Sequence, residues 1–163
     1  MRARGILVLA GFAFAAAVSA QTKVSGELRC GKPDPYQKVD TGDRPNHAVT
    51  LSKSHCTWTK PTEMAGSPTK DGDSVATGEI DGDKSWEKGF HTGTVASGDK
   101  FYVRYTGEGM SKDGKMVGAK GTYTFAGGTG KLKGLKGKGT YSGKPDANGD
   151  VIFHIEGAYT LPK

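Results

Sequence analysis

Motifs for binding metals or nucleotides are missing from this sequence of 163 residues, and cysteine is scarce. No CxxC, HxH or HExxH unit occurs, and the four histidines are scattered, so no local metal site is predicted. No GxxxxGK[ST] phosphate loop is present. Beyond residue 20, no apolar stripe repeats at i, i+3, i+4 and i+7, which argues against amphipathic helices. We therefore expect no metal, cofactor or nucleotide.

The first twenty residues have the form of an export signal. Arg2 and Arg4 precede an apolar run, residues 6–18, which is too short to span a bilayer comfortably and is followed by small residues suited to cleavage. We predict that residues 1–20 are a signal peptide and that residues 21–163 form the mature domain, with no transmembrane anchor after cleavage. A retained membrane anchor is the alternative reading. The mature protein is expected in the periplasm or outside the cell.

The composition of the mature chain favours short strands joined by tight turns. Its size is that of one ordinary domain. The formal net charge falls from +6 to +4 because two arginines leave with the signal. Glycine costs backbone entropy inside regular elements and is useful in turns. The 26 glycines therefore predict many short strands and many tight turns.

Two cysteines, Cys30 and Cys56, lie in the mature chain. In an exported protein an even cysteine count favours a disulfide, and closing a loop of this length would stabilise the fold by about 3 kcal/mol. A metal site is the weaker alternative. His55 and Cys56 are neighbours, and neighbouring side chains of a strand point to opposite faces.

Turn signals divide the mature chain into short segments of β character. Asp-Gly or Asn-Gly pairs at 71–72, 81–82, 113–114 and 148–149 are typical of hairpins, and Gly98-Asp99 is weaker. The segments between them are residues 23–29, 48–52, 74–80, 85–95, 100–107, 116–126, 137–142 and 151–159. About eight strands at regular spacing predict an all-β fold, a sandwich or a barrel. Two proline-containing segments, residues 32–45 and 60–70, are predicted to be loops.

Several of these segments alternate between apolar and mixed residues. Phe101, Val103 and Tyr105 share one face of their segment, and Phe153 and Ile155 share a face of the last one. One face of each strand is therefore expected to pack inward. Apolar residues on the opposite faces, Ile152 and Tyr102 among them, suggest partial cover by another subunit.

Residues 125–134, FAGGTGKLKG, followed by GKGTY at 137–141, resemble the allene oxide cyclase and dirigent-like barrel proteins. Residues 91–105 are similar to a stretch of exported bacterial relatives of unknown function, and the resemblance covers residues 85–159. It implies a single antiparallel closed barrel of about eight strands, related in shape to calycins. Members are often trimers. Plant members act on small hydrophobic substrates as cyclases, or orient them for radical coupling without catalysis.

The same glycine-rich stretch has a physical reading of its own. Leu132 and Leu135 are three apart, so one short helical turn would place both on the same side and close a barrel end. Gly137 and Gly139 leave one face of their strand without side chains, which allows a sharp bend or a close backbone contact.

The candidate ligand-binding residues are few. His154 and Glu156 share one strand face, and Arg104 lies on a comparable face of another strand. Pointing inward, they would form a polar cluster able to orient a ligand or to move a proton, whereas pointing outward they would be ordinary solvated side chains. His91 is a further candidate.

Charged segments elsewhere have simpler explanations. Lysines at 131, 133, 136, 138 and 144 could meet anionic polymers, but they are typical of a soluble surface, and the sparse aromatics argue against nucleic acid. Residues 146–150 resemble the opening of a calcium loop without its later glycine and glutamate. We interpret them as a turn.

The resemblance and the inward aromatic residues predict an exported, non-enzymatic binder of a small, partly apolar molecule. Two alternatives stay open. One is an isomerase or cyclase that needs no cofactor, and the other is a structural or interaction protein of the cell envelope that acts as a homo-oligomer, a trimer by resemblance.

Overall fold

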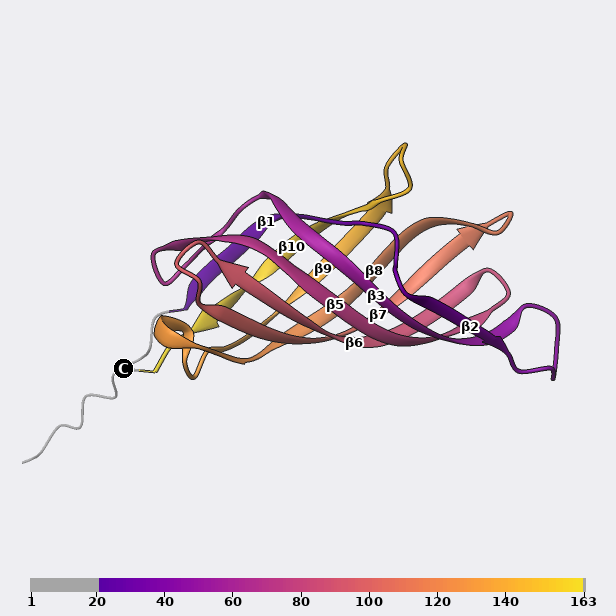
Figure 1. The fold of residues 1–163 in the computed structure, drawn as a ribbon, viewed down its shortest axis with the longest axis horizontal. Helices are drawn as coiled ribbons and strands as arrows, with labels where there is room; N and C mark the ends of the chain where they lie inside the picture. The colour runs from indigo at the N-terminus through magenta and orange to yellow at the C-terminus, as the bar shows by residue number, and fades with distance from the viewer. Residues whose placement is uncertain (1–20, 163) are drawn as a thin grey trace, which may run out of the picture.

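The computed structural model describes residues 21–162, so the predicted signal peptide lies outside the described residues (Figure 1). The described chain is built almost entirely of β-strands. They are β1 (Thr22–Cys30), β2 (Tyr36–Asp40), β3 (His47–Lys60), β4 (Glu63–Met64), β5 (Ser67–Asp81), β6 (Lys84–Val95), β7 (Lys100–Lys112), β8 (Lys115–Gly128), β9 (Lys136–Pro145) and β10 (Val151–Thr160), with a 3-10 turn, η1 (Gly130–Leu132), between β8 and β9.

Eight of these strands close into one antiparallel barrel, which confirms the predicted fold class. The order around the barrel is β3-β1-β10-β9-β8-β7-β6-β5, and pairing of β3 with β5 completes the circle. The remaining two, β2 and β4, extend the edges beside β3 and β5. Closure removes the free edges of the eight main strands and places every second side chain inside.

The predicted turns at 81–82, 113–114 and 148–149 join strands as expected. The prediction of a turn at Asp71-Gly72 was wrong, because both residues lie inside β5. The register between β5 and β6 shifts between Thr69 and Gly72, and a Cβ at Gly72 would lie 2.8 Å from the Gly93 Cα. The glycine therefore serves a close approach of two strands at a bulge.

The segment 32–45 is only partly the loop that its prolines predicted, because it contains β2. Both β1 and β2 pair with the same edge of β3, β1 along its second half and β2 along its first. The residues between them stay on that edge, since the Gly31 and Asp34 amides donate to the carbonyls of His55 and Lys53. Prolines are compatible with such a path because β2 pairs on one side alone. Likewise, segment 60–70 contains β4 and the start of β5.

One end of the barrel is closed by a dense apolar plug. Leu132 and Leu135 are 0% and 1% exposed, so the turn η1 tucks both inward as predicted. Met64, from β4, and Val95 are buried beside them in the same core cluster. The Asp99 carboxylate accepts the Lys131 amide at 3.2 Å, which ties η1 to the β6–β7 connection.

The other end is open and irregular. The hairpins β2–β3, β5–β6 and β7–β8 run on past Cys30 and Val151, where β1 ends and β10 begins, as the right side of Figure 1 shows. The β9–β10 turn is held over this end by Arg29, whose guanidinium contacts Asp146 at 2.8 Å and Asp150 at 2.9 Å. The three long hairpins therefore form a tall rim on one side of the mouth, and the ends of β1 and β10 form a lower rim on the other.

The predicted disulfide between Cys30 and Cys56 is present and crosslinks β1 to β3, where the two residues are direct register partners. Among residues 21–162 there is no helix with the length and apolar character needed to cross a membrane.

Candidate ligand-binding cavity

The barrel encloses a cavity of about 380 Å³ between the apolar plug and the open end. Its walls come from the inward positions of nearly every barrel strand. The aromatic side chains that face inward are Trp58, Phe101, Tyr105, Tyr123, Phe125, Tyr141 and Phe153, and the half-exposed Tyr36 and Trp86 also line the cavity. This is the size range of small-molecule sites, which are mostly apolar with a few well-placed polar groups.

Aromatic rings fill the space that inward glycines leave free. The Tyr141 ring lies against Gly107 and Gly121 on the neighbouring strands β7 and β8, where added methyl groups would overlap it. The Tyr123 ring lies against Gly139 and Gly157 in the same way. The predicted bare face of β9 is thus confirmed as a place of close approach. The glycines let large rings lie flat along the wall, so the centre of the barrel is not filled.

A carboxyl group, Glu87 of β6, points into this aromatic interior. It shares an inward face with His91 and Val95, because the three positions have the same parity on the strand. The Tyr141 hydroxyl donates to it across 3.4 Å, which is a long hydrogen bond. Burial raises the pKa of Glu87, and the Tyr141 hydrogen bond opposes this only in part.

The tyrosines around Glu87 are held in their neutral form. Burial, together with the Glu87 charge, raises the pKa of both Tyr105 and Tyr141. Burial alone raises the pKa of Tyr123 to about 12. These hydroxyls can therefore offer hydrogen bonds at neutral pH without becoming anionic.

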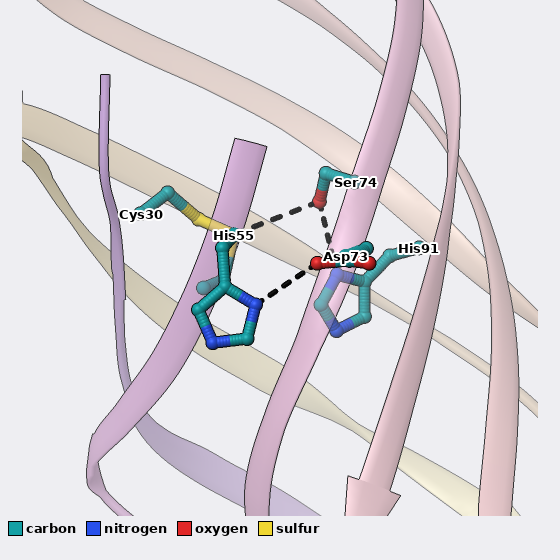
Figure 2. The surroundings of a disulfide bond; sticks show 6 residues. Cys30, His55, Asp73, Ser74 and His91 are labelled. Atoms are coloured by element: carbon teal, nitrogen blue, oxygen red, sulfur yellow. Dashed lines mark hydrogen bonds and ion pairs between the residues drawn. A yellow bond between two sulfur atoms is a disulfide. The ribbon is translucent and has the colours of Figure 1, made fainter. Parts of the chain in front are cut away.

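A second polar group, formed by Ser74 and His91, lies beside the disulfide (Figure 2). The Ser74 hydroxyl lies 2.9 Å from His91 Nδ1 and 3.7 Å from Cys56 Sγ. His91 is 7% exposed, and burial lowers its pKa to about 4, so the ring is neutral at pH 7. His55 and Asp73, which share a 2.9 Å contact, lie on the outer face of the same strands.

Three buried polar atoms on the cavity wall have no hydrogen-bond partner within residues 21–162. They are Trp58 Nε1, His91 Nε2 and the Tyr123 hydroxyl. Buried polar groups are nearly always paired, because an unpaired one costs about 1–3 kcal/mol.

Of the four residues predicted as ligand-binding candidates, His91 alone lines the cavity. Arg104 lies outside, 5.3 Å above the Phe90 ring, and His154 lies outside beside Glu27 at 3.4 Å. Glu156 is exposed on the same outer face of β10. The inward polar cluster of Arg104, His154 and Glu156 is therefore not formed, and any ligand contact by these three stays a prediction.

Glu87 and Tyr141 were missed by sequence reasoning. The signal for both is strand parity. Glu87 is in phase with His91 on β6, and Tyr141 is in phase with Gly137 and Gly139 on β9. The sequence analysis instead selected Arg104, His154 and Glu156 because they are ionisable, although they lie on the outer faces of their strands.

The eight strands form a closed antiparallel barrel with one plugged end and one open end. Comparison with solved structures then identifies the fold as dirigent-like. The chain matches the pterocarpan synthase dirigent protein GePTS1 with a TM-score of 0.54 and 13% identity, over 96% of this chain and 98% of that chain. It matches the pterocarpan synthase dirigent protein PsPTS1 with a TM-score of 0.52 and 14% identity, over 88% of this chain and 97% of that chain. No family model and no curated protein sequence matches this chain.

Proposed function

We propose that this protein is an exported, non-enzymatic binding protein for a small, partly apolar molecule. The carrying observation is the cavity of about 380 Å³, which is open at one barrel end and lined by aromatic rings. The polar side chains among its lining residues, Ser74, Glu87 and Tyr105, support a ligand that combines an apolar body with hydrogen-bonding groups. The disulfide is compatible with export, because such bonds persist in oxidising compartments.

The fold also supports a binding role. Both similar structures are described as dirigent proteins, and the likeness concerns the barrel itself. The isomerase or cyclase alternative loses the polar cluster on which it was based. The envelope-interaction alternative, as a trimer or other homo-oligomer, stays a prediction that light scattering would test.

The test uses 2-naphthol, a neutral, partly apolar probe, in a calorimetric titration of the mature protein. Ser52 lines the cavity near the mouth, and Lys53 is its outward-facing neighbour on β3. Ser52→Trp should abolish probe binding because the indole occupies the entrance, whereas Lys53→Trp should bind like the wild type. Absence of binding to the wild type, or equal loss in both folded variants, would refute the proposal.

A further inference from the structure

The cavity has a charge character that the proposed function does not use. Glu87 faces its aromatic interior, and within residues 21–162 this carboxyl forms no ion pair. Its one hydrogen-bond partner is the Tyr141 hydroxyl at 3.4 Å. The groups that interact with it, the hydroxyls of Tyr105 and Tyr141, bring no positive charge, and the His91 ring farther along the same strand face is neutral.

Basic side chains lie away from this position. Lys32 reaches the cavity only at the mouth, where its Cε lies against the β9–β10 turn. The other carboxylate among the lining residues, Glu79, is half exposed and already contacts His47 Nε2 at 2.9 Å. Glu87 is therefore the carboxyl on the cavity wall that lacks a cation, and a lone carboxylate among apolar groups is costly.

The aromatic rings near Glu87 are also suited to binding a cation. The centroids of Tyr105 and Tyr141 are 6.1 Å apart in an edge-to-face pair, and those of Tyr141 and Phe153 are 5.6 Å apart in another. Such pairs leave ring faces turned in different directions around one space. Aromatic faces attract ammonium groups, most strongly where water is excluded.

We propose that the molecule bound in this cavity carries an ammonium group on its apolar body, with that cation placed beside Glu87 and against the paired rings of Tyr105 and Tyr141. This inference rests on the proposed function and adds the charge of the ligand to it. A cation would compensate the Glu87 charge, and an anionic ligand would be repelled by it. A neutral alcohol could hydrogen-bond to the carboxylate but would leave its charge uncompensated.

Two probes with one carbon skeleton test the inference: 2-(2-naphthyl)ethylamine, which is an ammonium ion at pH 7.5, and 2-(2-naphthyl)ethanol. Calorimetric titration of the wild type should show the amine binding about tenfold more tightly or better. Glu87→Gln should remove this preference and keep the alcohol affinity. Glu79→Gln, the matched change at the other wall carboxylate, should keep the preference.

The outcomes separate the two proposals. Equal affinities for amine and alcohol in the wild type would overturn the inference and leave the proposed function standing, whereas binding of neither probe would overturn both. A preference that survives Glu87→Gln but is lost in Glu79→Gln would also overturn the inference. Should circular dichroism show Glu87→Gln to be unfolded, Glu87→Asp is the second variant, and it should weaken amine binding alone by withdrawing the carboxylate by one methylene.

Discussion

Replacing Gly107 by alanine tests whether glycines make room for the cavity rings. A methyl group there would lie 3.0 Å from both the Tyr141 Cζ and the Lys120 carbonyl oxygen, and closer still to the Tyr141 hydroxyl. A carbon and an oxygen need roughly 3.3 Å, so the hydroxyl would have to retreat by roughly 1 Å. Overpacking of this kind costs about 1–3 kcal/mol. We expect Gly107→Ala to lower the free energy of unfolding by that amount in urea denaturation.

The hydroxyl is the main obstacle, so its removal should restore much of the loss. In a double-mutant cycle with Tyr141→Phe, we expect a coupling energy of about 1 kcal/mol in favour of the double variant. Gly118→Ala on β8 is the matched control. Its methyl group would meet only the Gly143 carbonyl at 3.5 Å, so the change should be neutral or stabilise by up to about 1 kcal/mol. Strict additivity of Gly107→Ala and Tyr141→Phe would refute this reasoning.

Three further predictions concern stability. Reduction of Cys30–Cys56, confirmed by thiol titration, should lower Tm by about 10 °C in calorimetry because it removes about 3 kcal/mol, and an unchanged Tm would contradict the crosslink's role. Leu132→Ala should cost about 2–5 kcal/mol in urea denaturation, since the side chain is fully buried in the plug, whereas the exposed neighbour Lys131→Ala should cost under about 0.5 kcal/mol. His91, with a folded pKa of about 4 against 6.5 in the unfolded chain, binds fewer protons when folded. Its contribution of about 3 kcal/mol is therefore present above pH 6.5 and lost as the pH falls through 4, and unfolding at stepped pH should show a steeper loss for the wild type than for His91→Gln.

The barrel could be predicted largely from local patterns. Alternation, turn dipeptides and the Leu132–Leu135 spacing are all short-range signals, and the structure confirms what they imply about strand number and the plugged end. The hairpin formed by β2 and β3 is also local, but it was missed. Prolines at 33 and 35 concealed β2 because they mark loops in most contexts.

The cavity was predictable in its apolar part and missed in its polar part. Val103 and Tyr105 share an inward face, so strand parity already required Arg104 to point outward. The same parity places Phe153 inside and His154 outside. Glu87 was harder to recognise because glycines occupy the inward positions at 89 and 93, and the apolar residue on its face, Val95, lies at the far end of the strand.

Both ends of the described chain lie at the plugged end of the barrel, since Thr22 of β1 pairs with Tyr159 of β10 beside the apolar plug. The mouth lies at the opposite end, where β1 ends at Cys30 and β10 begins at Val151. Attachment of this barrel to a surface through either end of the described chain would therefore present every mouth to the solution in the same orientation. A terminal affinity tag would leave the entrance clear, so a sensor chip carrying the tagged protein would report the binding of small molecules without masking the site.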